Sequence, residues 1–456
     1  MKLAVVILAA GQGKRMKSDL PKVLQPLAGR PLLGHVVSRA RGLAPTSMHV
    51  VYGHGGDQVR AAFQDQELHW ALQAEQLGTG HALMQAMPKV ADDELVLVLY
   101  GDVPLIDVDT LRQLIALAGP KSLSLLTVMF DDPTGYGRIV RNARGAVQKI
   151  VEQKDASRAQ LRIREGNSGI LAAPAKLLRR WLGRLKNANA QGEYYLTDVI
   201  GMAVKDKVKV APLIAPRLAE VLGVNDRAQL AGLETLHRAD CARQLMLAGA
   251  TLADPSRIDV RGDVTVGRDV FIDANVLFEG SVKLGDRVRV GPNVVLRDVT
   301  VGAGSIIHPN SILEQSEVGG GCLIGPYARL RPGSKLADEV HIGNFVELKK
   351  TEVGHGSKAN HLTYLGDAIV GKGANIGAGT ITCNYDGVNK SQTTIGDGAF
   401  IGSGNMLVAP VRIGRDATTG AGSTISKDAP AGQLTLARSK QVTLEGWKRP
   451  VKKPKA

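Results

Sequence analysis

Residues 266–296 run VGRDVFIDANVLFEGSVKLGDRVRVGPNVVL, and every sixth residue of this stretch is large and apolar. The same spacing returns further along the chain after short slips of register. Its positions are Val266, Ile272, Phe278, Leu284, Val290, Leu296, Val301, Ile307, Leu313, Val318, Ile324, Leu330, Leu336, Ile342, Leu348, Val370, Ile376, Ile395, Ile401, Leu407, Ile413 and Ile425. Six-residue units are typical of a parallel β-helix, in which each unit forms one short strand and a corner. We therefore expect a three-sided prism filled by these stacked side chains, with coils about 4.8 Å apart.

Two stretches interrupt this spacing. The longer one lies between Ile376 and Ile395, contains TITCNYDGVNKSQTT, and is expected to project from the prism as a loop. The other covers Val353–Ile369 and is expected to be a second break in the repeat. Because repeat proteins carry long insertions on their binding faces, we expect chemistry at both stretches.

Length and composition set the broad class of the protein. The 456 residues favour two or three domains. The three cysteines, Cys241, Cys322 and Cys383, are too few for a disulfide framework and indicate a reducing compartment. No apolar run reaches the roughly 18 residues that a membrane span needs, and the apolar stretch in MKLAVVILAAGQGKRM is too short for a signal peptide. We expect a soluble, cytoplasmic protein.

The formal net charge of +14 suits phosphorylated small molecules as well as nucleic acid. Part of it lies in KRPVKKPKA after Trp447, whose composition predicts a disordered basic tail. Aromatic residues are only 4% of the chain and do not alternate with basic ones, as they would on a surface that stacks bases. We therefore expect small-molecule substrates and no nucleic-acid partner.

The first half of the chain alternates apolar runs with helical patterns, which predicts a mainly parallel, Rossmann-like α/β sheet covered by helices. The expected strands are Val5–Ala10, Met48–Tyr52, Leu95–Tyr100 and Ser122–Met129, and the expected helices include Pro31–Arg41 and Asp109–Ala118. Helical spacing from Asn225 to Gly249 predicts a connecting helix. The expected division is residues 1–227 for the α/β domain, 228–248 for a helical linker and 249–456 for the prism with its tail.

Polar residues follow several of these strands. The turn LAAGQGKRM places Gly11 and Gly13 where backbone N–H groups can approach phosphate oxygens, and Arg15 adds charge. Lys22 stands in a loop before a helix, and Asp102 ends the buried strand LVLVLY, where it could hold Mg²⁺ against a triphosphate. Taken singly, each has an ordinary alternative: a tight strand exit, a solvated lysine or a helix cap.

Together, LAAGQGKRM, PKVL, QAEQLGTG and YGDVPL resemble the sugar-phosphate nucleotidyltransferases. With the prism, the chain resembles the family of bifunctional N-acetylglucosamine-1-phosphate uridyltransferases / glucosamine-1-phosphate N-acetyltransferases from about residue 3 to residue 449. The motifs DDPTGYGRI, QGEYYLTDVI, GVNDR, RLRPGS, HLTYLGD and NIGAGTITCNYDG carry this likeness. It implies acetyl transfer from acetyl-CoA to glucosamine-1-phosphate, then Mg²⁺-dependent uridylyl transfer from UTP, yielding UDP-N-acetylglucosamine and pyrophosphate for bacterial cell-wall and lipopolysaccharide sugars. It also implies a left-handed β-helix and a homotrimer that binds acyl-CoA between neighbouring prisms.

For uridylyl transfer, the resemblance implies a role for charge neutralisation rather than for a covalent nucleophile. Arg15 and Lys22 would offset phosphate charge, and Asp102 and Asn225 would bind Mg²⁺. Nucleotide contacts are implied at Leu8, Ala9, Ala10, Gly11, Lys22, Gln73, Gly78, Thr79, Tyr100, Gly101 and Asp102. Sugar contacts are implied at Gly137, Glu152, Asn167 and Asn225. No side chain explains a preference for uracil, and we expect backbone contacts to decide it.

For acetyl transfer, the resemblance of HLTYLGD to the family's catalytic segment implies that His361 is the base that takes the proton of the attacking amine. On its own, a loop histidine is more often structural. Acceptor contacts are implied at Arg331, Lys349, Tyr364, Asn375, Asn384 and Tyr385. Acetyl-CoA contacts are implied at Ala378, Ser403, Ala421 and Arg438, although small residues are also ordinary at the corners of such coils.

Three other functions stay open at this point. A zinc-dependent hydratase would use histidines between prisms, and the candidates are His308, His341, His355 and His361. Ligands on adjacent coils should lie about 18 residues apart, which only the spacing of His341 and His361 approaches. A sugar-nucleotide sensor without turnover would not need intact Arg15, Lys22, Asp102 and His361. A nucleotidyltransferase with a regulatory prism would show a damaged acetyl site, and HLTYLGD and NIGAGT show no damage.

Overall fold

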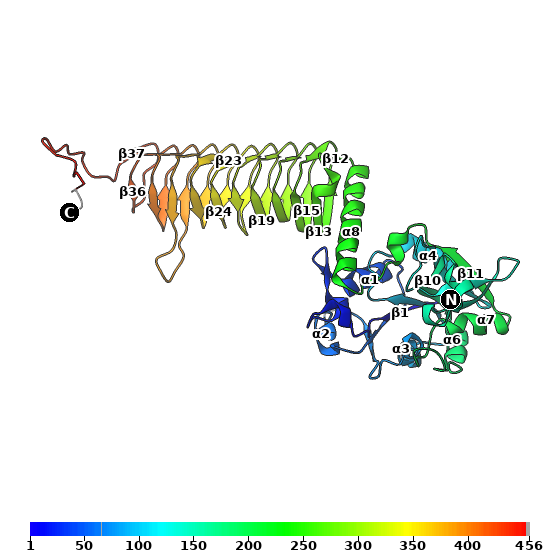
Figure 1. The fold of residues 1–456 in the computed structure, drawn as a ribbon. Coiled ribbons are helices and arrows are strands. Elements are labelled where there is room, and N and C mark those ends of the chain that lie inside the picture. The colour runs from blue at the N-terminus through cyan, green and yellow to red at the C-terminus, as the bar shows by residue number, and fades with distance from the viewer. Residues whose placement is uncertain (65, 453–456) are drawn as a thin grey trace. The chain divides into compact units, whose positions relative to one another are not determined.

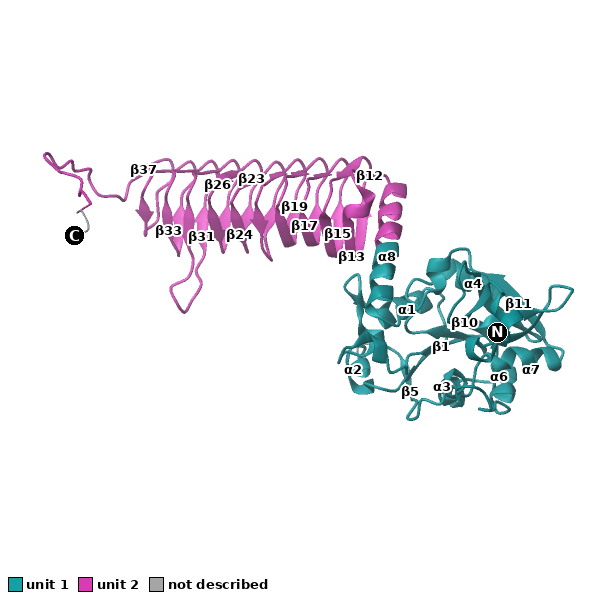
Figure 2. Ribbon diagram, viewed as in Figure 1, with its two compact units in different colours: residues 1–237 teal, residues 238–456 magenta. Residues whose placement is uncertain are grey.

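The computed structural model describes residues 1–64 and 66–452. The chain forms two compact units, Met1–His237 and Arg238–Ala456, which are teal and magenta in Figure 2. The boundary between them falls inside helix α8 (Arg227–Leu247), where the sequence predicts a connecting helix. Residues 453–456, the end of the predicted basic tail, lie outside the described residues. Within the described residues, none of the helices combines the length and the apolar character that crossing a membrane requires.

Unit 1 is built on a nine-stranded sheet with the main path β11-β7-β10-β6-β1-β4-β5 (Figure 1). Its strands are β1 (Leu3–Leu8), β4 (Ser47–Tyr52), β5 (His69–Leu72), β6 (Leu95–Tyr100), β7 (Ser122–Met129), β8 (Arg138–Arg141), β9 (Val147–Val151), β10 (Glu165–Pro174) and β11 (Lys209–Ile214). β1 pairs in parallel with β4 and β6, whereas β10 runs antiparallel to β6 and β7. The mainly parallel centre of the sheet, predicted from the sequence, is confirmed.

Helices cover both faces of this sheet. They are α1 (Leu32–Arg41), α2 (Gly56–Ala61), α3 (Thr79–Ala86), α4 (Val108–Leu117), α5 (Arg158–Leu161), α6 (Ala175–Leu182) and α7 (Asp198–Lys205), and short 3₁₀ turns include η1 (Lys14–Met16) and η2 (Lys22–Leu24). Alternate residues of β1 enter two different cores: Val6 packs with the α3, α6 and α7 side, and Ile7 packs with the α1 and α4 side. Both faces of β1 are therefore buried, as expected for a parallel strand covered by helices.

The predicted first strand is shifted by two residues. It was expected over Val5–Ala10, but β1 covers Leu3–Leu8, so Ala9 and Ala10 belong to the turn that follows it. Both alanines are buried, and the Ala9 N–H donates to the Val51 carbonyl at 2.8 Å. The apolar run in the sequence shows which residues are buried, and here the buried residues continue past the end of the strand.

Unit 2 is the expected parallel β-helix. One side carries β12 (Ala250–Leu252), β14 (Val270–Ile272), β16 (Arg289–Val290), β18 (Ile306–Ile307), β20 (Leu323–Ile324), β23 (His341–Asn344), β26 (Lys358–His361), β29 (Asn375–Ile376), β32 (Phe400–Ile401), β35 (Thr418–Thr419) and β37 (Leu434–Thr435). The other sides carry β13 (Ile258–Val266), β15 (Val276–Leu284), β17 (Val295–Val301), β19 (Ile312–Val318), β21 (Arg329–Leu330), β22 (Lys335–Leu336), β24 (Glu347–Lys349), β25 (Glu352–Val353), β27 (Tyr364–Gly366), β28 (Ala368–Val370), β30 (Ile381–Cys383), β31 (Thr393–Ile395), β33 (Met406–Val408), β34 (Val411–Ile413) and β36 (Thr424–Ile425).

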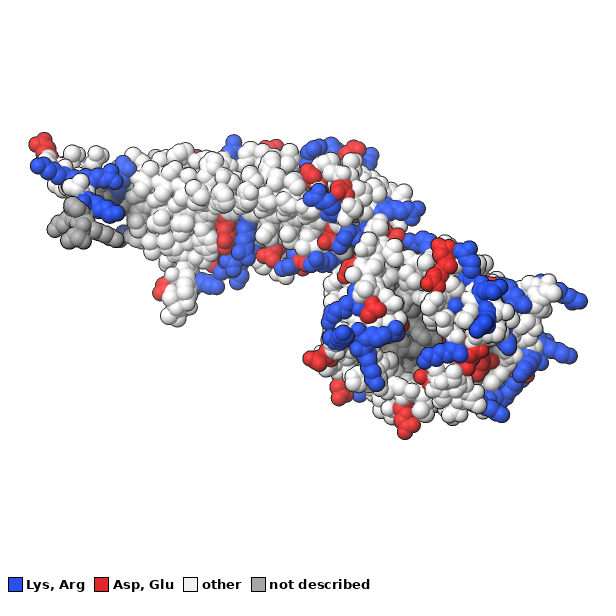
Figure 3. Space-filling model, in the orientation of Figure 1, with Lys and Arg blue, Asp and Glu red and all other residues white. Residues whose placement is uncertain are grey.

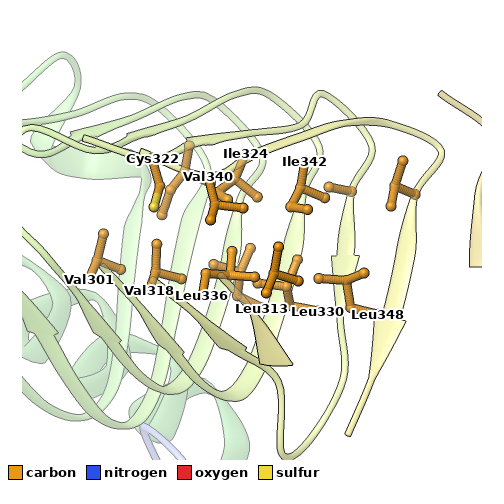
Figure 4. Packing of buried hydrophobic residues seen from close by; sticks show 14 of the residues in the cluster. Val301, Leu313, Val318, Cys322, Ile324, Leu330, Leu336, Val340, Ile342 and Leu348 are labelled. Atoms are coloured by element: carbon orange, nitrogen blue, oxygen red, sulfur yellow. The ribbon is translucent and has the colours of Figure 1, made fainter. Parts of the chain in front are cut away.

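The interior of the prism is a continuous stack of aliphatic side chains. Figure 4 shows one row, formed by Leu313, Leu330 and Leu348, which are partners on successive strands. All three are fully buried. At one corner, Asn275 donates to Asn293 at 2.9 Å and Asn293 donates to Asn310 at 3.1 Å, so that an amide ladder ties three coils together. The leucines of this row are positions that the six-residue spacing predicts, whereas Cys322 and Val340, which are buried in the same core, are not.

The expectation of a break over Val353–Ile369 is wrong. Val353 pairs directly with Val370, so these residues form one ordinary coil. Its inward positions are filled by Ala359, which pairs with Ile342, and by Leu365, which pairs with Leu348. The small Ala359 side chain at an inward position hid the repeat. The loop between Ile376 and Ile395 is a true insertion, and it projects from the prism between β30 and β31 (Figure 1).

We predict that Leu330→Ala lowers the stability of unit 2 by about 2–5 kcal/mol, because it leaves a cavity between two packed coils. Urea unfolding followed by far-ultraviolet circular dichroism measures this loss. Lys335→Ala is the matched control, because Lys335 is exposed on the neighbouring strand β22, and it should change stability by less than about 0.5 kcal/mol. Equal effects of the two substitutions would contradict the packing argument.

Candidate active sites

A cavity of about 320 Å³ opens in unit 1 beyond the carboxyl ends of β1 and β6. Ten of the residues implied for nucleotide binding line it: Leu8, Ala9, Ala10, Gly11, Lys22, Gln73, Gly78, Thr79, Tyr100 and Asp102. Val23, Gln76, Ala82 and Glu193 line it as well and were not proposed from the sequence. Gln76 belongs to the motif QAEQLGTG and Glu193 to the motif QGEYYLTDVI. Both are polar residues within motifs that carry the resemblance, and this is the sequence feature that could have identified them as cavity residues.

The glycine-rich turn lies directly against Lys22. Gly13 has φ +63°, and a Cβ there would stand 2.6 Å from the Lys22 Cβ, so only glycine lets the two backbone segments approach this closely. Arg15 follows on the 3₁₀ turn η1, where its side chain is exposed. Arg15 and Gly101 are not among the residues that line the cavity, although the Gly101 N–H donates to the Leu8 carbonyl at 2.9 Å and so joins the ends of β6 and β1.

An ion pair between the Lys22 Nζ and Asp102 Oδ2 lies in this cavity. Both side chains are largely shielded from solvent, with 12% and 18% of their surfaces exposed. The Val224 N–H donates to the Asp102 backbone carbonyl at 3.0 Å, which brings the backbone of the adjacent Asn225 close to that of Asp102, although Asn225 does not line the cavity. The two residues implied as metal ligands, Asp102 and Asn225, are therefore neighbours in space.

This pair offers only oxygen ligands, one from a carboxylate and one from a carboxamide. Within residues 1–64 and 66–452, no group of three or more His, Cys, Asp and Glu side chains could hold a metal ion. A site with one carboxylate suits Mg²⁺, which usually takes one or two protein ligands and completes its shell with water and phosphate oxygens. The residues present thus fit a magnesium ion that is shared with a nucleotide.

Three residues implied for the sugar lie together beside Tyr100. A Cβ on Gly137 would stand 3.4 Å from both carboxylate oxygens of Glu152. The Asn167 N–H donates to the Gly137 carbonyl at 2.8 Å, and the Thr197 hydroxyl donates to Glu152 Oε1 at 2.9 Å. Burial raises the pKa of Glu152. Burial also raises the pKa of Tyr100, and the Glu152 and Asp102 carboxylates add to the rise, so Tyr100 is the link between this group and the cavity.

In unit 2, His361 ends strand β26 and its side chain is exposed. Its Nδ1 lies 3.0 Å from Oδ1 of Asn344, the residue opposite it on strand β23. An amide oxygen can only accept, so Nδ1 is the donor, and in the neutral imidazole Nε2 is then the nitrogen that can take up a proton. Asn344 was not proposed from the sequence, because its position opposite His361 follows only from the register of the coils.

A charged cluster lies on the next side of the prism, beyond the corner formed by residues 362 and 363. Arg331 pairs with Glu347 at 2.9 Å, and Lys349 lies 3.9 Å from Asp367, which also accepts from Asn384. Tyr364 is on strand β27 beside Glu347. This arrangement brings together four of the residues implied for the sugar phosphate: Arg331, Lys349, Tyr364 and Asn384.

Two acceptor candidates are not in this charged cluster. Asn375 pairs with Lys358 on the side of the prism that carries His361, and Tyr385 is exposed on the projecting loop. Lys390 is an unpredicted cation here: its contact with Lys349, followed by burial, lowers the pKa of Lys349. Only the folded position of the loop, and no local sequence signal, brings Lys390 to Lys349.

The residues implied for acetyl-CoA follow one edge of the prism. The Gly404 N–H donates to the Ala378 carbonyl at 2.7 Å, and the Gly422 N–H donates to the Ser403 carbonyl at 2.8 Å. Arg438 reaches back and donates to the Ala421 carbonyl at 2.8 Å. These four residues therefore mark successive coils, and the Gly379 N–H, 3.4 Å from the His361 carbonyl, joins them to His361.

Comparison with known proteins agrees with both units. Residues 5–196 match the MobA-like NTP transferase domain, and residues 263–298 and 392–427 match the bacterial transferase hexapeptide repeat. The chain is 59% identical over 450 residues to the bifunctional protein GlmU of Azoarcus sp., covering 99% of this chain and 100% of that protein. It is 57% identical over 453 residues to the same-named protein of Stutzerimonas stutzeri, with 99% and 100% covered.

The fold and the sites define a two-domain transferase, with a nucleotidyltransferase domain followed by a hexapeptide-repeat acyltransferase domain. The chain belongs to the GlmU family of bifunctional enzymes. It carries a uridyltransferase and an acetyltransferase activity, the two activities of UDP-N-acetylglucosamine biosynthesis that the sequence predicts. Its substrates are accordingly small molecules, a nucleotide among them.

We predict that Gly78→Ala lowers uridyltransferase kcat/KM by about tenfold or more. Gly78 has φ +105°, and a Cβ would stand 2.8 Å from the Tyr194 carbonyl oxygen, so the cavity wall must shift. Gly145→Ala is the control, because Gly145 also has a positive φ but a Cβ there would meet nothing within 4 Å. Steady-state kinetics with UTP compare the two, and an unimpaired Gly78→Ala enzyme would contradict this account of the wall.

Proposed function

We propose that the unit 1 cavity binds UTP and N-acetylglucosamine-1-phosphate and that uridylyl transfer takes place beside the Lys22–Asp102 pair. The observation that carries this proposal is that pair, a cation and a carboxylate in a cavity walled by a glycine-rich turn. Exposed N–H groups of such a turn suit phosphate oxygens. The Gly137–Glu152–Asn167 group beside Tyr100 would bind the sugar hydroxyls and acetamide.

The reaction needs charge neutralisation and alignment. An oxygen of the sugar phosphate attacks the α-phosphorus of UTP, a new P–O bond forms, and the bond to pyrophosphate breaks. Lys22 and Arg15 offset negative charge on the phosphates, and the glycine-rich turn fixes their position. Asp102 and Asn225 would hold Mg²⁺, which supplies further neutralisation of the reacting phosphates when bound.

Acetyl transfer is assigned to the prism around His361. With Nδ1 held by Asn344, the free Nε2 accepts the proton of the glucosamine-1-phosphate amine as that nitrogen attacks the thioester carbonyl. A C–N bond forms, the C–S bond breaks, and coenzyme A leaves. Arg331 and Lys349 suit the phosphate of the acceptor, because both are cations on the adjoining side of the prism.

Acetyl-CoA would lie along the edge marked by Ala378, Ser403, Ala421 and Arg438. Small side chains leave room there for an extended pantetheine chain against the backbone. A homotrimer would complete this groove, and apolar side chains on the prism support it: Tyr327 and Phe345 are stacked at 5.2 Å yet half exposed, and Leu362 beside His361 is 62% exposed. Figure 3 shows that much of one prism face carries no charged side chain.

We assign residues 1–227 to the uridyltransferase domain, 228–248 to the linker and 249–456 to the acetyltransferase domain. Helix α8, which covers Arg227–Leu247, supports these limits. A cytoplasmic location follows from the substrates, since UTP and acetyl-CoA are cytoplasmic metabolites.

We predict that Asp102→Ala reduces Mg²⁺-dependent uridylyl transfer by about 10³-fold or more, because Lys22 loses its partner and the metal loses its carboxylate. Pyrophosphate release measures this activity, and acetyl transfer by the same variant should be normal. Asp109→Ala is the control, since Asp109 is exposed and pairs with Arg112. Normal Mg²⁺-dependent turnover by Asp102→Ala would refute the assignment.

We predict that His361→Ala lowers acetyl transfer by about 10²–10⁴-fold, the usual worth of a general base. Release of the coenzyme A thiol measures this step, and uridylyl transfer should be unaffected. His355→Ala is the matched control, an exposed histidine of the same prism that lies 3.6 Å from Glu339. If His361→Ala acetylated at the wild-type rate, another base would have to act.

A further inference from the structure

The side-chain amide of Gln73 is held from two directions. Gln73 directly follows strand β5, lines the unit 1 cavity and is 3% exposed. Its Nε2 donates to the Gly78 carbonyl at 3.1 Å and lies 3.1 Å from Nδ1 of His81 on helix α3. An amide nitrogen has two hydrogens, and each has an acceptor here if Nδ1 is unprotonated. With both hydrogens engaged, what Gln73 can offer a ligand in the cavity is its carbonyl oxygen Oε1.

A second glutamine competes for the same imidazole. The Gln85 Nε2 lies 3.1 Å from His81 Nε2 and also donates to the His81 carbonyl at 3.1 Å. A neutral imidazole has one acceptor nitrogen, so Gln73 and Gln85 cannot both donate to it. Gln73 is buried and fixed by Gly78, whereas Gln85 is half-buried and can turn toward solvent. The acceptor is therefore Nδ1, and Nε2 carries the proton.

The orientation of this amide matters because pyrimidine bases differ at one ring position. N3 of uracil carries a hydrogen and donates, whereas N3 of cytosine accepts. A carbonyl oxygen aimed at this edge pairs with uracil and repels cytosine, and a flipped amide would do the opposite. Sites built to hydrogen-bond one group discriminate strongly against a ligand that leaves their polar atoms unpaired.

We propose that His81 is a positioning residue for nucleotide choice: it holds the Gln73 amide so that Oε1 faces the base, and thereby favours UTP over CTP. The inference rests on the proposed binding of UTP in the unit 1 cavity. It adds a side-chain basis for uracil preference where the sequence suggested backbone contacts alone. Two contacts hold the Gln73 amide in one orientation, one with the Gly78 carbonyl and one with the His81 ring. Gly78 contributes a backbone atom, so only the His81 contact can be removed by substitution of a side chain.

The test compares kcat/KM for UTP with kcat/KM for CTP in the full-length enzyme. His81→Phe removes the acceptor but keeps a ring beside Tyr194, whose ring centre lies 6.3 Å from that of His81. His81→Asn restores an acceptor oxygen near the position of Nδ1. His81→Ala is a second variant without an acceptor, and Gln85→Ala is the control on the other side of the ring. Thermal unfolding of each variant, followed by far-ultraviolet circular dichroism, reports whether unit 1 has folded.

We expect His81→Phe and His81→Ala to lower the ratio of the two kcat/KM values by about tenfold, which corresponds to one hydrogen bond. His81→Asn should recover most of the ratio, and Gln85→Ala should leave it unchanged. Equal losses with both nucleotides, or failure of His81→Asn to recover the ratio, would mean that His81 only supports helix α3 and would overturn the inference. A wild-type enzyme that uses neither nucleotide would instead refute the proposed function and the inference with it.

Discussion

The prism depends on one constraint: each coil must meet the next in register, both in its backbone hydrogen bonds and in its buried side chains. The Ile324–Ile342 and Leu330–Leu348 pairs satisfy both at once. Because the coils are in register, equivalent corners form straight edges along the prism. A site built on such an edge is linear, which suits an extended ligand, and the Ala378–Ser403–Ala421 edge has that form.

In unit 1, the position of the site is determined by the burial of the central strands. β1 and β6 are apolar on both faces, so no charged group can stand along them without being buried. Their parallel pairing brings both carboxyl ends to one edge of the sheet. Lys22 and Asp102, which are 80 residues apart in the chain, meet there and are each other's counter-charge. The cavity is thus a consequence of the burial of the strands that end at it.

The sequence predicted what depends on local pattern and missed what depends on register. β6 and β7 have the predicted bounds: β6 is apolar throughout up to Tyr100, and β7 is mostly apolar although it contains Ser122, Ser124 and Thr127. The coil over Val353–Ile369 was mistaken for a break because Ala359 fills an inward position with a small side chain. Asn344 and Lys390 were missed for a related reason, since each matters only through a neighbour on another coil or loop.

Each candidate site contains an imidazole that is hydrogen-bonded at Nδ1 by a neighbouring side-chain amide. The amide sets whether Nδ1 donates or accepts, and the role of Nδ1 is opposite at the two sites. At His361, the Asn344 oxygen accepts from Nδ1 and leaves Nε2 free to take a proton. At His81, the proposal makes Nδ1 the acceptor for the Gln73 nitrogen, and the consequence appears on the glutamine, whose oxygen is then left for a ligand in the cavity. A neutral imidazole can serve both purposes because its two nitrogens have opposite roles. The difference lies in exposure: His361 faces solvent and can exchange a proton, whereas the buried Gln73 beside His81 gains only a fixed orientation.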